Sequence, residues 1–134
     1  MRDPVLLRRQ VVLVVDDDEP TRAALQDVLL DAGYVVATAA DGDEAVEVMH
    51  GMSPDAVVLD LMMPKLDGWS VATWMRQQPH LMGTPIVIMT AHGAATLARA
   101  PVASAYLSKP VGLDRLLGAL SRAVSIRPPP PPAP

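Results

Sequence analysis

Five short apolar runs, each followed by a segment with helical spacing of apolar residues, constrain the fold of this chain more than any other feature. A continuous apolar run of this length is typical of a strand buried on both faces, as in a parallel sheet. Right-handed crossovers between such strands place helices on both faces of the sheet. The pattern therefore predicts an α/β fold with a doubly wound, five-stranded parallel sheet. The strands are expected at residues 11–15, 34–39, 56–59, 85–89 and 105–107.

The segments between these runs have the spacing and the ends of amphipathic helices. In the first segment, apolar residues recur three and four positions apart, Pro20 stands in the first turn and Gly33 ends the segment. The fourth segment predicts a short helix, because only seven residues separate Gly93 from Pro101 and the position before a proline disfavours helix. The five helices are expected at residues 20–33, 42–49, 67–78, 94–100 and 112–125.

The length of the chain and its last residues predict the domain organisation. The 134 residues are near the commonest size of a single domain, and half of them are apolar, so one full core can form. We expect an N-terminal extension at residues 1–9, the folded domain at 10–125 and a proline-rich tail at 126–134. Five consecutive prolines favour an extended polyproline II shape. The tail is interpreted as a solvated terminus, a ligand for an aromatic groove, or the stub of a linker.

Composition and charge exclude several classes of protein. The net charge of −4 argues against a nucleic-acid partner, which needs a basic surface. The absence of cysteine excludes disulfides, zinc–thiolate sites and cysteine catalysis. The sequence contains no apolar run long enough for a membrane span or a signal peptide. We therefore expect a soluble cytoplasmic protein without a membrane partner.

Polar residues with complementary chemistry stand at the ends of four predicted strands. Asp16 and Asp17 follow the first strand and Asp60 follows the third. Thr90 and Lys109 stand at the ends of the fourth and fifth. Because ligands of such sheets bind beyond the carboxyl ends of the strands, these side chains are expected at one site. Clustered carboxylates are tolerable around a divalent cation, and oxygen-only ligands suit Mg²⁺, with the lysine ammonium supplying further positive charge.

Four motifs, in this order and each at a predicted strand end, resemble those of the receiver domain of two-component response regulators. They are VVDDDE, VLDLMMPKLDG, IMTA and YLSKP, and the likeness spans roughly residues 10 to 125. The resemblance implies a flavodoxin-like fold with strand order 2-1-3-4-5 and five helices. It also implies a signalling module like the chemotaxis response regulators. Because no output domain follows the last predicted helix, we expect a stand-alone receiver or one excised from a longer regulator.

The resemblance implies a phosphoacceptor site. Asp60 would take a phosphoryl group from a histidine kinase or a phosphotransfer protein, and hold it as an acyl phosphate. The Mg²⁺ cofactor would be held by Asp17 and Asp60, by the backbone carbonyl of Met62, and through water by Asp16. Lys109 would pair with one phosphoryl oxygen. Asp18 and Glu19 fit better as acids of the first turn of the helix.

The resemblance also implies a switch on the last two strands. Thr90 would donate its hydroxyl to a phosphoryl oxygen, and Ala91 would leave room for the phosphoryl group. Movement of Thr90 would let Tyr106 turn inward and change the affinity for a partner. The family pattern also implies a cis peptide bond between Lys109 and Pro110.

Two residues that flank the expected phosphoryl pocket depart from the usual family pattern. Met62, two positions after Asp60, cannot orient an attacking water with its thioether, and His92 stands two positions after Thr90. We expect this pair to tune the lifetime of the phosphoryl group.

Two other functions compete with that of a receiver domain. Asp16 and Asp18 have the spacing of the nucleophile motif in haloacid-dehalogenase-type phosphatases, but Pro20 stands where that motif has a small hydroxyl residue or valine. A pseudo-receiver that binds partners without phosphate would lack a site residue, and none is missing. We therefore expect a phosphoacceptor rather than an enzyme, one that at most catalyses its own phosphorylation and dephosphorylation.

Overall fold

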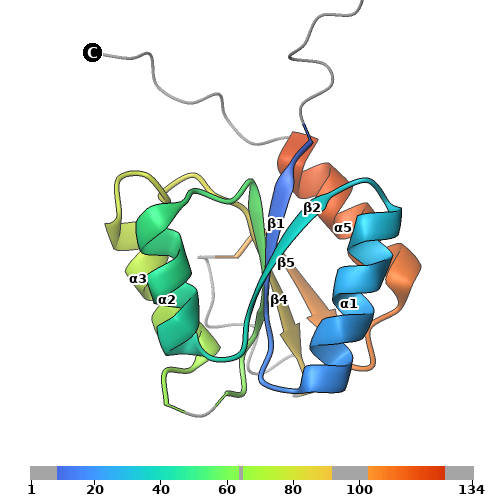
Figure 1. Ribbon diagram of the computed structural model, residues 1–134, viewed down its shortest axis with the longest axis horizontal. Coiled ribbons are helices and arrows are strands. Elements are labelled where there is room, and N and C mark those ends of the chain that lie inside the picture. Colours follow the sequence, from blue (N-terminus) through green and yellow to red (C-terminus); the bar gives the residue numbers. More distant parts are fainter. Residues whose placement is uncertain (1–8, 64, 92–102, 126–134) are drawn as a thin grey trace, which may run out of the picture.

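A computed structural model describes residues 9–63, 65–91 and 103–125 of the chain. The described part alternates strands and helices, as the apolar runs predict (Figure 1). The elements are β1 (Val11–Val15), α1 (Glu19–Asp31), β2 (Val35–Ala39), α2 (Gly42–Gly51), β3 (Ala56–Asp60), α3 (Gly68–Gln77), β4 (Ile86–Thr90), β5 (Ala105–Ser108) and α5 (Leu113–Ser125).

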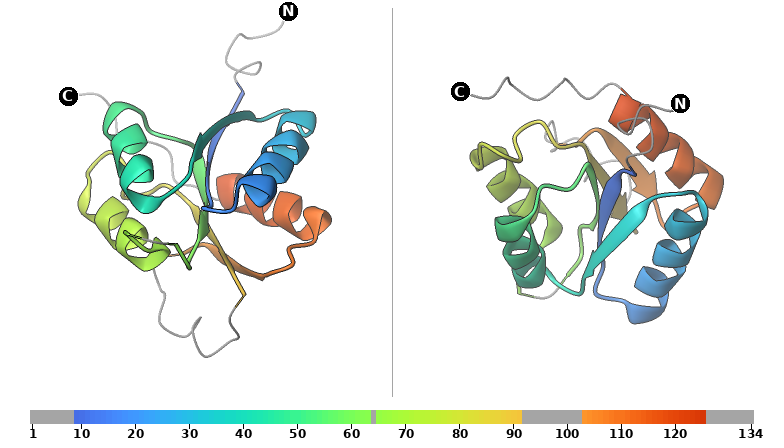
Figure 2. Two further views of the ribbon diagram at one scale, coloured as in Figure 1. Left: turned by 60° about the horizontal axis from the view of Figure 1, so that its bottom comes forward. Right: turned by 45° about the horizontal axis from the view of Figure 1, so that its top comes forward.

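The five strands form one parallel sheet in the order β2-β1-β3-β4-β5. Helices α1 and α5 cover one face and α2 and α3 cover the other (Figures 1 and 2). This arrangement confirms the doubly wound sheet and its strand order. The described residues contain four helices, and the short helix expected at 94–100 lies outside them, within residues 92–102.

The core consists of two aliphatic layers, one on each face of the sheet. Successive side chains of a strand point to opposite faces, so each strand contributes to both layers. Leu13 and Val15 of β1 pack toward α2 and α3, whereas Val12 and Val14 pack toward α1 and α5. Because both faces are covered, all five residues of β3 and of β4 are buried. Continuous apolar strands are the sequence signature of this burial.

Aspartates begin three of the helices. The side chains of Asp18, Asp41 and Asp67 accept hydrogen bonds from backbone N–H groups in the first turns of α1, α2 and α3. Such N-caps satisfy donors that have no partner inside the helix. Gly33 follows α1 with a φ of 98°, a conformation that favours glycine. In the described part of the chain, no helix is both long and apolar enough to cross a membrane.

Strand ends differ from the sequence prediction by one residue, and the difference matters for the site. Asp60 and Thr90 are the last residues of β3 and β4 rather than residues beyond them. Both are therefore fixed by sheet pairing, Asp60 opposite Met89 and Thr90 opposite Ser108. The carboxyl ends of the strands lie together at the edge that is lowest in Figure 1.

Candidate functional site

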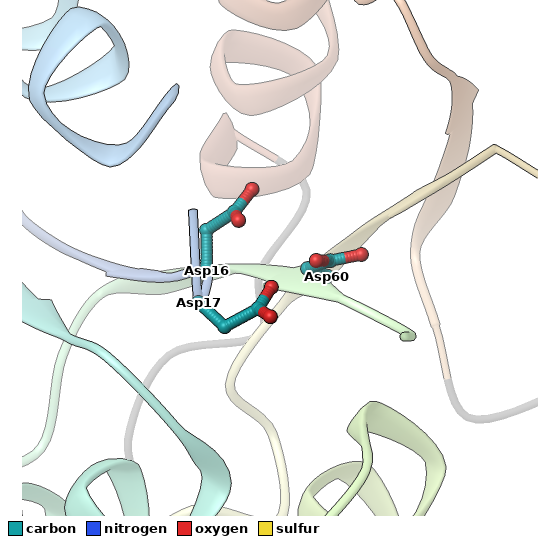
Figure 3. A group of neighbouring side chains, drawn as sticks. All are labelled: Asp16, Asp17 and Asp60. Carbon is teal, nitrogen blue, oxygen red and sulfur yellow. The ribbon is translucent and has the colours of Figure 1, made fainter. Parts of the chain in front are cut away.

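Three aspartates meet where the strand order reverses, between β1 and β3. Asp16 and Asp17 follow β1, Asp60 ends β3, and one carboxylate oxygen from each lies within 4.8 Å of the others (Figure 3). Asp16 and Asp60 are buried, with exposed fractions of 0% and 3%, whereas Asp17 is exposed. The structure thus brings together the three acids that the sequence predicts at one site, and it leaves one of them facing solvent.

Lys109 bridges the two buried acids. Its Nζ lies 3.1 Å from Oδ2 of Asp16 and 3.3 Å from Oδ2 of Asp60. The backbone N–H of Lys109 donates to the carbonyl of Thr90 at 2.8 Å, which ties the end of β5 to the end of β4. The peptide bond between Lys109 and Pro110 is cis, as the family pattern implies. One ammonium therefore faces two buried carboxylates.

The electrostatics of the site follow from this unequal pairing. Burial raises the pKa of Asp60 above its ordinary value, and the charge of Asp16 raises it further against the opposing effect of Lys109. Burial alone would lower the pKa of Lys109, but its hydrogen bond to Asp16 and the charges of both acids outweigh burial and raise that pKa. The buried acids hold more negative charge than the lysine offsets.

The backbone around Asp16 is held by contacts that the sequence analysis did not find. The Asp16 N–H donates to the carbonyl of Ala39 at 3.2 Å, and Asp16 Oδ1 accepts from the N–H of Asp18 at 2.9 Å. Arg22 reaches back from α1 and donates from Nη1 to the Asp16 carbonyl at 2.8 Å. A basic residue one turn into a helix that follows four acids is the only sequence signal for this contact.

The acidic run after β1 divides between the site and the helix. Asp18 caps α1, and its hydrogen bonds from the side chain and backbone of Thr21 lower its pKa. Glu19 is the first residue of α1 and lies in the first turn, where negative charge is favourable. Neither belongs to the acid cluster. This confirms the expectation that they serve the helix.

The residues after Asp60 turn back toward the end of β3. The N–H of Met62 donates to Asp60 Oδ1 at 3.2 Å, and the residue is 56% exposed. The N–H of Gly68 donates to the carbonyl of Leu61 at 3.1 Å. The backbone of Met62 therefore contacts the Asp60 carboxylate, while the residue as a whole is exposed to solvent.

The residues expected to form a switch lie on β4 and β5. Thr90 is fully buried at the end of β4, and Ala91 follows it in an exposed position. Tyr106 pairs with Ile88 and packs into the core layer on the side of α2 and α3, and burial raises its pKa. His92 lies outside the described residues. Thr90 and Tyr106 are thus on neighbouring strands, two residues apart in register.

The chemistry of the acid cluster fits a divalent cation. All of its donors are carboxylate oxygens, which are the ligands that Mg²⁺ prefers, and exposed Asp17 leaves access from solvent. A cation there would favour the charged form of Asp60, whose pKa is raised by burial and, to a smaller extent, by the charge of Asp16.

Comparison with known proteins supports the same class of site. A family model described as the response regulator receiver domain matches residues 12–121. Among curated proteins, the transcriptional regulatory protein TcrA of Mycobacterium tuberculosis is 42% identical over 121 residues, which cover 88% of this chain and 47% of the relative. The DNA-binding transcriptional regulator NtrC of Escherichia coli is 34% identical over 122 residues, which cover 89% of this chain and 26% of the relative. The chain thus spans at most about half the length of these relatives.

Solved structures agree over nearly their whole length. The chemotaxis response regulator CheY4 of Vibrio cholerae aligns with a TM-score of 0.81 and 33% identity, covering 87% of this chain and 99% of that one. The receiver domain of the sensor histidine kinase PA1611 of Pseudomonas aeruginosa aligns with a TM-score of 0.81 and 28% identity, covering 88% and 99%. That domain is described with a magnesium ion coordinated in its active-site cleft.

Proposed function

This chain belongs to the family of response regulator receiver domains, which are signalling modules of two-component systems, and we propose that Asp60 is its phosphoacceptor. The observation that carries the proposal is the position of this carboxylate. It ends the central strand β3, has Lys109 Nζ at 3.3 Å and lies in one acid cluster with Asp16 and Asp17.

Burial and hydrogen bonding favour Asp60 over Asp16 as the nucleophile. Asp16 is 0% exposed, and its two oxygens accept from the Asp18 N–H at 2.9 Å and from Lys109 at 3.1 Å. The corresponding contacts of Asp60 are longer, 3.2 Å from the Met62 N–H and 3.3 Å from Lys109. Asp60 is thus the less constrained of the two buried acids. The same comparison disfavours the phosphatase alternative, which needs Asp16 as the nucleophile.

The proposed reaction moves a phosphoryl group from a phosphohistidine of a histidine kinase or phosphotransfer protein. A carboxylate oxygen of Asp60 forms a bond to phosphorus while the phosphorus–nitrogen bond of the donor breaks, and the imidazole leaves with the electron pair. Lys109 holds positive charge beside the acceptor, where negative charge spreads over the transferring oxygens.

Mg²⁺ is the proposed cofactor of the transfer. Asp17, Asp60 and the carbonyl of Met62 would bind it directly, and Asp16 would bind it through water. When bound, Mg²⁺ supplies positive charge that stabilises the transferring phosphoryl group. Exposed Asp17 keeps the cluster accessible from solvent.

Thr90 and Tyr106 are proposed to report phosphorylation to a partner. The hydroxyl of Thr90 would bind a phosphoryl oxygen, Ala91 would leave room for it, and Tyr106 would turn inward. Met62 and His92 would flank the pocket and tune the lifetime of the acyl phosphate. The burial of Thr90 beside the end of β5 supports the first of these roles.

We further propose that the domain acts as a phosphoacceptor and not as an enzyme on other substrates. Its partners would be the phosphoryl donor and a protein target, reached by switched binding or by onward relay. DNA binding is named for relatives such as NtrC, of which this chain spans 26%. For the domain itself, the net charge of −4 argues for a protein partner rather than nucleic acid.

Phosphoryl uptake from acetyl phosphate tests the proposal. The wild-type chain should gain the mass of one phosphoryl group when Mg²⁺ is present and none in excess chelator. Asp60→Asn should gain none, and Asp17→Asn should need far more Mg²⁺. Asp27→Asn, which changes an exposed carboxylate of α1 outside the acid cluster, is the matched control and should be labelled like wild type. Equal labelling of Asp60→Asn would reject the assignment.

A further inference from the structure

We propose that Gly42, the first residue of α2, is a positioning residue for the cation site. Its missing side chain lets the start of α2 lie against the backbone of Leu66. This contact fixes the loop between β3 and α3, whose described residues are 61–63 and 65–67. The inference rests on the proposed function, in which Asp60 and the carbonyl of Met62 hold the cation.

The start of α2 lies too close to the loop for any side chain at position 42. A Cβ built on Gly42 would clash with the carbonyl oxygen of Leu66 and would lie 2.7 Å from its Cβ and 2.9 Å from its carbonyl carbon. Two of these three atoms are backbone, so a rotamer change of Leu66 cannot relieve the clash. Any larger residue must therefore move the helix or the loop.

Capping hydrogen bonds stabilise the first turn of α2. Asp41 Oδ1 accepts from the Glu44 N–H at 2.8 Å, and Glu44 Oε2 accepts from the Ala40 N–H at 3.3 Å. Asp41 also approaches the loop directly, with Oδ2 at 3.6 Å from Lys65 Nζ. Lys65 has a φ of 66°, a conformation that non-glycine residues rarely adopt. Because buried Ala45, in the first turn of α2, also packs into the core, we expect the loop rather than the helix to move.

A movement of the loop reaches Asp60 because both ends of the loop contact residues at the end of β3. At its far end, a Cβ on Gly68 would clash with the Asp60 carbonyl oxygen and lie 2.8 Å from Cα of Leu61. At its near end, the Met62 N–H donates to Asp60 Oδ1 at 3.2 Å. A displaced Leu66 therefore changes the path of the few residues that carry the Met62 carbonyl.

The test is the Mg²⁺ affinity of Gly42→Ala, measured by titration calorimetry beside its unfolding free energy in urea. We expect Mg²⁺ to bind about tenfold more weakly, the usual loss when a residue that orients a metal ligand is changed. Gly51→Ala is the matched control, because Gly51 ends the same helix and a Cβ there meets nothing within 4 Å. It should bind Mg²⁺ like wild type.

A purely structural role would lower the unfolding free energy of Gly42→Ala and leave its Mg²⁺ affinity unchanged, which would overturn the inference. If that variant does not fold, amide exchange of the wild-type chain with and without Mg²⁺ tests the inference instead. Coupling between two sites is reciprocal, so Mg²⁺ should slow amide exchange at Glu44 and Ala45 but not at Met49, near the other end of α2. Equal changes at both ends, or none, would overturn the inference. Failure of the wild-type chain to bind Mg²⁺ would instead overturn the proposed function, and this inference with it.

Discussion

Asp16 and Asp60 share one ammonium, that of Lys109, and both are almost completely buried. At the scale of single residues, burial raises the pKa of Asp60 and the charge of Asp16 adds to this effect, because the one ammonium does not offset both. These buried acids lower the stability of the metal-free protein, and a bound cation would offset that cost, which makes the cluster a candidate functional site.

The first prediction concerns the dependence of stability on Asp60 and on pH. Because the pKa of Asp60 is raised on folding from its ordinary value of 3.8, the folded state binds this proton more tightly than the unfolded state. The contribution of Asp60 to stability is therefore lost as pH rises through the raised pKa. Without metal, Asp60→Asn should unfold at higher urea than wild type at neutral pH, and the advantage should shrink as pH falls toward 3.8. A variant less stable than wild type at neutral pH would contradict this account.

The second prediction concerns the shared ammonium. Lys109→Met should lower the unfolding free energy by about 2 kcal/mol, because it leaves two buried carboxylates unpaired while solvent already screens part of the lysine. The same variant should bind Mg²⁺ more tightly, since a positive charge beside the cation is gone. Arg122→Met is the control, because Arg122 is an exposed basic residue in the last turn of α5, outside the acid cluster, and should change little. Weaker Mg²⁺ binding by Lys109→Met would argue against this electrostatic account.

The acid cluster could be predicted residue by residue, whereas its supports could not. Asp16, Asp17 and Asp60 each follow or end an apolar run, and the parallel sheet brings such ends together. The contact of Arg22 with the Asp16 carbonyl and the contact of Gly42 with Leu66 depend on the path of loops. Neither residue type has a periodicity that marks its partner. Loop paths follow from packing between distant segments, which spacing along one chain does not reveal.

At the scale of single elements, the apolar stripe of each helix decides its stability. Helix α1 shows this with two neighbouring leucines, because Leu29 is 0% exposed and Leu30 is 49% exposed. Leu29 packs between the sheet and the helix, in the layer that also contains Leu120 of α5. Such helices depend on tertiary packing more than on intrinsic propensity.

The third prediction compares these two leucines. Leu29→Ala should lower the unfolding free energy by about 3 kcal/mol, through lost burial and the cavity left behind. Leu30→Ala removes the same atoms from the same helix and should cost less than about 0.5 kcal/mol, as for other surface substitutions. Urea denaturation of both variants is the measurement. Equal losses would mean that helix propensity, and not packing against the sheet, holds α1 in place.

The positions of strands could be predicted from the sequence where burial on both faces requires an unbroken run of apolar residues. Strands β1, β3 and β4 are buried on both faces, so their sequences are unbroken apolar runs and their positions differ from expectation by at most one residue. Helix ends were harder, because they depend on which residue caps them. Asp18 rather than Pro20 marks the start of α1, and Pro20 lies within its first turn.

At the scale of the whole molecule, the strand order turns separate motifs into one site. The chain runs from β1 to β2 on one side of β1 and returns to β3 on its other side. The loops that follow β1 and β3 therefore lead in opposite directions, which leaves a crevice at the neighbouring carboxyl ends of these two strands. Asp16, Asp17 and Asp60 stand at those two ends. Helices cover both faces of these strands (Figure 2), and all their residues except Val11 are buried. Only this edge of the sheet brings the acids, Lys109 and the end of β4 together.

The most direct test of the account locates the phosphoryl group within the sequence. After the chain has reacted with acetyl phosphate and Mg²⁺, borohydride reduces an aspartyl phosphate to homoserine, which peptide mass spectrometry can place. If Asp60 is the phosphoacceptor, homoserine should appear at position 60 of the wild-type chain and at no position in Asp60→Asn. Homoserine at position 16 or 17 of the wild-type chain, with residue 60 unmodified, would contradict it.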